Sequence, residues 1–258
     1  MTILPGAGNT YERRVSAALL AAGDHAVAAR WTAAYLLGIV DRPAAGVELL
    51  VPYGKGVPDL GSHVHVSRSR TITDREVVRA RHLPCTSAER SFCDLAEGTR
   101  TGVLRGHLID ANQRGLVRYP RVLDKTFALR GSPGMPRLRT LLHELAPEAC
   151  DSIFVYHVRG ALTAAGMAPD PVPAAVTARN GVVVHPDITY QPYRVGVECE
   201  GFGAHNSRRH LDRDIRRRNT LRGTGYAIIW VGWERFEHDL DGFLAEVRDE
   251  LVARGWPG

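Results

Sequence analysis

The order of hydrophobic patterns after residue 151 constrains the fold more than any other feature of this chain. A helical pattern over residues 152–166 leads into three β-rich runs, then a polar helix, a fourth β-rich run and a closing helix. The β-rich runs cover residues 171–178, 181–190, 194–201 and 226–233. Asn180-Gly181 between the first two runs predicts a hairpin. The order α-β-β-β-α-β-α predicts a mixed sheet flanked by helices.

The first half of the chain reads as mainly helical with a few short strands. Helical spacing covers residues 11–23 and 26–39, with Gly23 and Gly38 as helix stops. β-like runs occupy residues 46–52 and 63–70. Further helices are expected over residues 86–98, 103–116, 119–131 and 135–147, the first of them capped by Thr86 or Ser87. The whole chain is therefore predicted to be α+β, with a boundary near residue 148 between regions 1–148 and 149–258.

Three carboxylates fall within strands that should be mostly buried. Asp187 follows Pro186 near the end of one β-rich run, and Glu198 and Glu200 lie in the next. Alternate residues of a strand share a face, so Glu198 and Glu200 point the same way with Cys199 opposite. Buried carboxylates are costly unless they are paired or bind a cation. Converging acidic oxygens would suit Mg²⁺ or Mn²⁺; alternatively, the three pair with Arg194, His185 or the arginine-rich helix as a structural network.

The stretch "PDITYQPYRVGVECEGFGAH" resembles the PD-(D/E)XK nuclease superfamily, and within it the Vsr-like (very-short-patch-repair-like) endonucleases. The downstream "DRDIRRRNTLRGTGYAIIWVGWE" resembles the helix, turn and final strand of the same branch. The resemblance implies a restriction-endonuclease-like fold that hydrolyses DNA phosphodiester bonds with Mg²⁺ or Mn²⁺. It implies Asp187, Glu198 and the backbone carbonyl of Cys199 as metal ligands. It further implies catalytic roles for Glu200 and His205, with Asp214 supporting the site.

Two positions depart from the family pattern. Glu200 stands where many relatives have lysine, and Lys55 and Lys125, the two lysines of the chain, lie far away in sequence. By the same resemblance, Val155 occupies the position of a helix glutamate in related domains. These departures favour an alternative function, a non-catalytic DNA-binding or antitoxin-like regulator on a degenerate nuclease fold. A mismatch-specific nickase is a third reading.

The polar helix over residues 207–222 is strongly basic. It contains seven arginines and two acidic residues, Asp212 and Asp214. Its net charge of +5 equals the net charge of the whole chain. Such a helix beside an acidic site is suited to hold a DNA backbone, although a solvated face with i,i+4 ion pairs is the alternative. The arginines expected to contact DNA are Arg208, Arg209, Arg213, Arg216 and Arg217.

Residues 1–148 resemble the central region of AbiEi-like abortive-infection antitoxins, mainly through "TSAERSFCDLAEG" and the patterns before it. The winged helix that commonly begins such relatives is not expected, because about eight residues precede the first helix. A toxin or defence-system partner is implied by this resemblance alone. The four cysteines show no CxxC spacing, and no secretory signal or membrane span is visible, so a cytoplasmic protein is expected.

Overall fold

A computed structural model describes residues 10–200, 215–216 and 218–258. It contains helices and mixed sheets, so the fold is α+β, with sheets flanked by helices. The chain divides into two compact units, Met1–Leu138 and Arg139–Gly258. A cut at residue 148 would fall in the first turn of helix α7 (Pro147–Ala164). Within the described ranges, no helix is long and apolar enough to cross a membrane.

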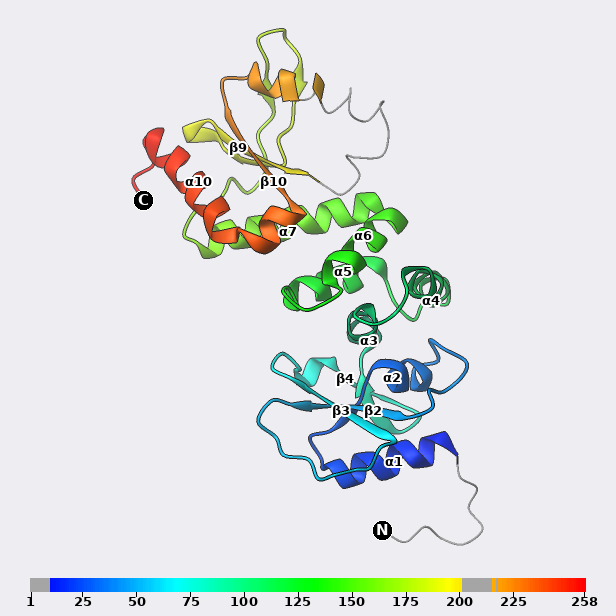
Figure 1. Ribbon diagram of the computed structural model, residues 1–258. Helices are drawn as coiled ribbons and strands as arrows, with labels where there is room; N and C mark the ends of the chain where they lie inside the picture. The colour runs from blue at the N-terminus through cyan, green and yellow to red at the C-terminus, as the bar shows by residue number, and fades with distance from the viewer. Residues whose placement is uncertain (1–9, 201–214, 217) are drawn as a thin grey trace, which may run out of the picture. The chain divides into compact units, whose positions relative to one another are not determined.

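The first unit is built on a five-stranded mixed sheet with the order β3-β2-β1-β5-β4. The strands are β1 (Val27–Ala28), β2 (Val47–Pro52), β3 (Val64–Ser69), β4 (Val77–Ala80) and β5 (Leu83–Thr86). β2 runs parallel to β3 and antiparallel to β1, and β4 runs antiparallel to β5. Helix α1 (Tyr11–Ala22) covers one face of this sheet and α2 (Arg30–Leu36) the other (Figure 1).

The prediction of a helix from residue 26 is wrong for residues 26–29. Val27 and Ala28 form β1, which pairs with Leu50 and Leu49 of β2, and α2 begins only at Arg30. Residues 26–29 are buried at the centre of the sheet. There, pairing on both sides satisfies the backbone and overrides the helical preference of alanine.

Most other helices of the first unit follow their sequence signals. α1 ends at Ala22, and Gly23 caps it with a φ of 97°, which is accessible to glycine, and an N–H that donates to the Leu19 carbonyl. Ser87 rather than Thr86 caps α3, because Thr86 belongs to β5. The remaining elements are α3 (Ala88–Ala96), α4 (Thr101–Gln113), α5 (Tyr119–Ala128), the 3₁₀ helix η1 (Asp74–Glu76) and α6 (Met135–Leu145), which spans the division between the units.

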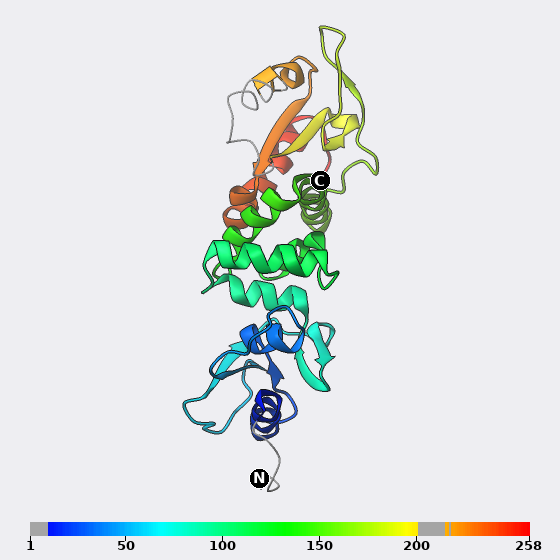
Figure 2. The ribbon, with the colours of Figure 1, turned by 90° about the vertical axis from the view of Figure 1, so that its right-hand side faces the viewer.

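The second unit contains a three-stranded mixed sheet, β10-β9-β8, and a two-stranded ribbon, β6-β7. The strands are β6 (Val176–Thr177), β7 (Val183–Val184), β8 (Ile188–Tyr190), β9 (Val195–Glu200) and β10 (Ala227–Gly232). β8 and β9 are antiparallel, whereas β9 and β10 are parallel and lie side by side (Figure 2). The hairpin predicted at Asn180-Gly181 is confirmed by the β6–β7 pairing, with Gly181 at φ 80°.

Two segments of the second unit that were predicted as single elements each form two elements in the structure. The β-rich run 181–190 is split around Pro186, so that β7 pairs with β6 while β8 pairs with β9. Similarly, the closing helical pattern forms α9 (Trp233–His238) and α10 (Leu240–Ala253), which meet at Asp239. Residues 215–216 and 218–222 of the arginine-rich segment are helical.

Aromatic packing and one buried ion pair organise the core of the second unit. α7 packs against β9, and α9 and α10 pack against β10. Phe154 of α7 stacks on Trp233 with ring centroids 4.5 Å apart. Arg139 and Glu237 form an ion pair of 2.5 Å, with side chains 2% and 6% exposed. The aromatic stack fixes α7 against α9, which follows β10 directly, and the ion pair joins α6 to the same helix.

Candidate active site

The β8–β9 hairpin brings Asp187 and Glu198 to facing positions. The short 3₁₀ turn η2 (Gln191–Tyr193) joins the strands, and Arg194 adopts a left-handed conformation that directs the chain into β9. Ile188 pairs with Val197, so the next position outward sets Asp187 opposite Glu198. Side chains at directly opposite positions of antiparallel strands have Cβ atoms roughly 5 Å apart. Asp187 lies directly before β8 rather than at the end of a strand.

A backbone hydrogen bond holds the Asp187 carboxylate against β9. Its Oδ2 accepts from the N–H of Cys199 at 2.8 Å. Glu198 is only 4% exposed and sits between this hairpin position and Trp230 of β10, its partner across the parallel pair. Two carboxylates are thus fixed on adjacent strands, and one of them is almost fully removed from water.

A third carboxylate, Asp151 of α7, acts on the Cys199 thiol. Burial raises the pKa of the Cys199 thiol well above its ordinary value, and the negative charges of Asp187, Glu198 and Asp151 raise it further. Asp151 lies near the start of α7, and its Oδ1 is 3.1 Å from Nε2 of His143 on α6. Asp151 is therefore near enough to β9 for its charge to act on Cys199, whose side chain lies on the face opposite Glu198.

Sequence reasoning missed Asp151 and His143. The helix glutamate of related domains was matched to Val155, which lies one turn after Asp151 on α7. The signal available was helical periodicity, because residues four apart lie on the same face of a helix. Asp151 in "CDSIFVYHVRG" is the acidic residue that shares the face of Val155.

Glu200, in contrast, is engaged by an arginine. It forms an ion pair with Arg218, whose guanidinium lies 4.7 Å from the centre of the Trp230 ring. Both side chains are partly exposed, at 34% for Glu200 and 48% for Arg218. The pairing matches the structural-network alternative for this one carboxylate, since the arginine comes from the basic segment.

Several predicted residues lie outside the described part of the chain. They are His205, Arg208, Arg209, Arg213, Asp214 and Arg217. Arg216 is described, and it is exposed on the helical segment together with Arg218 and Arg222.

The donor atoms available at this site are oxygens. Hard divalent cations such as Mg²⁺ prefer carboxylate and carbonyl oxygens, so Asp151, Asp187, Glu198 and the Cys199 carbonyl suit them chemically. Among the residues that the structure describes, no three His, Cys, Asp or Glu side chains are gathered closely enough to form a ready metal site.

No protein-family model matches the chain, and no curated protein matches it.

Proposed function

We propose that the chain is a metal-dependent endodeoxyribonuclease of the PD-(D/E)XK superfamily, close to the Vsr-like branch, which cuts or nicks DNA. The observation that carries the proposal is the facing of Asp187 and Glu198 across the β8–β9 hairpin, with the charge of Asp151 acting on the same region. Asp187 and Glu198 place carboxylate oxygens at opposite positions of neighbouring chain segments, and such oxygens are the donors that a hard divalent cation prefers.

In this proposal Asp187, Glu198 and the backbone carbonyl of Cys199 hold Mg²⁺ or Mn²⁺. The bound cation would stabilise negative charge on the phosphoryl oxygen and lower the pKa of a water molecule. His143, 3.1 Å from Asp151, orients that carboxylate. Glu200 and His205 are proposed to assist proton transfer or phosphate contact, with Asp214 as a supporting residue.

The exposed arginines after residue 207 would hold the DNA backbone. Arg216, Arg218 and Arg222 are exposed on the helical segment, and phosphate contacts from arginine are strong and largely independent of base sequence. We assign the same role to Arg208, Arg209, Arg213 and Arg217. A cytoplasmic location is part of the proposal, since DNA is the substrate.

Plasmid cleavage tests the proposal. Supercoiled DNA is incubated with the full chain and Mg²⁺, Mn²⁺ or EDTA, and nicked and linear products are quantified. We expect metal-dependent cleavage that Asp187→Asn abolishes, whereas Asp241→Asn, an exposed carboxylate on α10, retains it. Cleavage in EDTA, or equal cleavage by both variants, would contradict the assignment.

A second function is favoured by the Glu200–Arg218 ion pair. A carboxylate neutralised by arginine, and an aliphatic Val155 on α7, are compatible with a non-catalytic DNA-binding regulator that has a toxin or defence-system partner. In that case the same plasmid assay gives no product with either metal. Fluorescence anisotropy in EDTA would then detect tight binding to one DNA sequence.

A further inference from the structure

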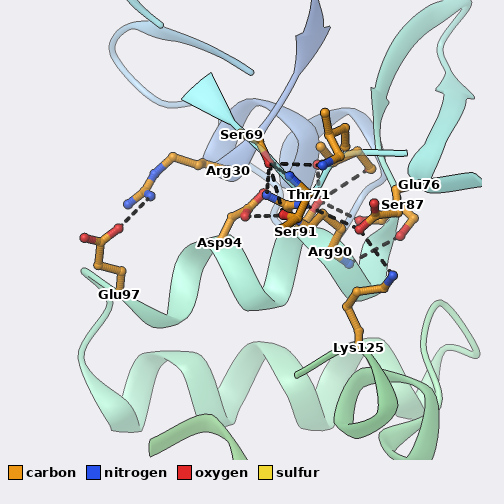
Figure 3. Close-up of polar contacts among 12 residues, drawn as sticks. Arg30, Ser69, Thr71, Glu76, Ser87, Arg90, Ser91, Asp94, Glu97 and Lys125 are labelled. Carbon is orange, nitrogen blue, oxygen red and sulfur yellow. Dashed lines mark hydrogen bonds and ion pairs between the residues drawn. The ribbon is translucent and has the colours of Figure 1, made fainter. Parts of the chain in front are cut away.

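The arginines of the polar network in the first unit are paired with carboxylates. Figure 3 shows Arg90 of α3 with two acidic side chains, Glu76 at 3.4 Å and Asp94 at 2.8 Å. Arg30, at the start of α2, lies 3.4 Å from Glu97. The positive charge of both arginines is therefore compensated within the unit.

The arginines around the β6–β7 ribbon of the second unit are not compensated in this way. Residues 171–186 and 215–226 contain no aspartate or glutamate. In the part of the chain that the structure describes, Arg179, Arg216 and Arg222 are exposed and form no ion pair. A surface with several uncompensated positive charges attracts an anionic partner.

The ribbon packs on the arginine-rich segment through one of its two faces. Val176 and Val184 pair across the ribbon and form a buried cluster with Leu221. The N–H of Arg179 donates to the carbonyl of Gly223 at 3.0 Å, which ties the tip of the ribbon to the turn after the helical segment. The ribbon and the exposed arginines therefore belong to one surface.

The opposite face of the ribbon is open to solvent. Thr177 and Val183 pair on this face, and the Val183 side chain is 54% exposed. Of the nine large hydrophobic residues that are exposed in the described part of the chain, four lie in or beside the ribbon and the arginine-rich segment. They are Val172, Val182, Val183 and Ile215. Clustered exposed apolar side chains mark a contact surface.

The tip of the ribbon is held in one conformation by its turn. Gly181 has a φ of 80°, and its N–H donates to the Ala178 carbonyl at 2.9 Å. Oδ1 of Asn180 accepts the N–H of Val182 at 3.1 Å. A turn fixed in this way presents its side chains to a partner with little further loss of conformational freedom.

We propose that the β6–β7 ribbon enters the major groove of DNA, where Val182 and Val183 contact the methyl groups of thymine. This inference rests on DNA as the proposed substrate. A two-stranded ribbon fits the major groove, and the thymine methyl is the apolar group exposed there. The neighbouring arginines hold phosphates on either side of the groove. A protein partner matches the surface less well, because the centre of a protein interface is depleted in charged residues.

The ribbon would supply the base preference that phosphate contacts alone lack. Fluorescence anisotropy of the full chain in EDTA, which prevents cleavage, tests this with two labelled duplexes of the same A·T-rich sequence. One duplex contains thymine and the other uracil, which lacks only the methyl group. We expect the thymine duplex to bind about threefold more tightly or better.

Two matched valine variants locate the contact. Val183→Ser should abolish the difference between the two duplexes, whereas Val252→Ser should retain it; Val252 lies on α10 and is also 54% exposed. Arg179→Gln should weaken both duplexes alike, as loss of a phosphate contact does. Thermal melting confirms that the variants remain folded.

Equal affinity of the unaltered chain for the two duplexes would overturn the inference, even if the chain cleaves plasmid DNA. Equal effects of Val183→Ser and Val252→Ser would overturn it as well. A thymine preference that Val183→Ser removes would support the ribbon contact even without plasmid cleavage, a result that would contradict the nuclease proposal alone. No binding to either duplex would overturn both.

Discussion

Removing the charge of Glu237 should destabilise the second unit far more than removing the charge of an exposed glutamate. Glu237 and Arg139 are 2.5 Å apart, with side chains 6% and 2% exposed. Glu237→Gln leaves a buried guanidinium without this carboxylate. Breaking a buried pair from one side costs about 3–5 kcal/mol. The matched control is Glu250→Gln. Glu250 lies 2.6 Å from Arg254, but its side chain is 35% exposed. Losing this ion pair should lower the free energy of unfolding by at most about 1 kcal/mol.

Urea unfolding followed by tryptophan fluorescence measures both changes. Trp230, Trp233 and Trp256 lie in the second unit and Trp31 in the first, so a Trp31→Phe background confines the signal to the second unit. With a urea slope of about 1–3 kcal/mol per molar, Glu237→Gln should move the midpoint by about 1 M or more. A loss for Glu237→Gln no greater than that of Glu250→Gln would refute the reasoning.

Three further predictions concern the first unit and the basic segment. Burial raises the pKa of Glu76, but hydrogen bonds from Thr73 and the charge of Lys125 lower it more, so the pKa lies below 4.5. Its stabilisation is therefore present above that pH and lost as pH falls, and Glu76→Gln should flatten the acid limb of unfolding free energy against pH. Gly131 and Gly134 both have a φ near 80°, but only at Gly134 would an added Cβ lie 2.6 Å from the backbone of Ala96. In urea unfolding, Gly134→Ala should therefore lower the free energy of unfolding by about 1–3 kcal/mol more than Gly131→Ala does. Equal losses in the two variants would contradict this. Arg216→Gln should weaken DNA binding for all sequences alike and reduce the salt slope by about 1; loss for one sequence only would contradict phosphate contact.

Patterns that depend on local chemistry were readable from the sequence. The Asn180-Gly181 hairpin and the cap of α1 at Gly23 follow from the conformations those residues favour. The mixed sheet of the second unit followed from the order of hydrophobic periods, and its β8–β9 pairing sets Asp187 opposite Glu198. The roles of these carboxylates remain predictions.

Features set by long-range pairing were not readable. β1 is two residues of an alanine-rich stretch, and only its partners β2 and β5 make it a strand. The place of Asp151 depends on how α7 packs against β9, which no local pattern encodes. The same holds for the Glu200–Arg218 pair, which joins residues 18 positions apart.

The central claim, that the facing carboxylates hold a divalent cation, is tested most directly by titrating the full chain with Mn²⁺ in a calorimeter. The account predicts saturable binding that Asp187→Asn and Glu198→Gln each weaken at least tenfold, while Asp241→Asn binds as the unaltered chain does. Circular dichroism confirms that the variants remain folded. The absence of saturable binding, or binding that neither site substitution changes, would contradict the claim and leave the acidic residues a purely structural role.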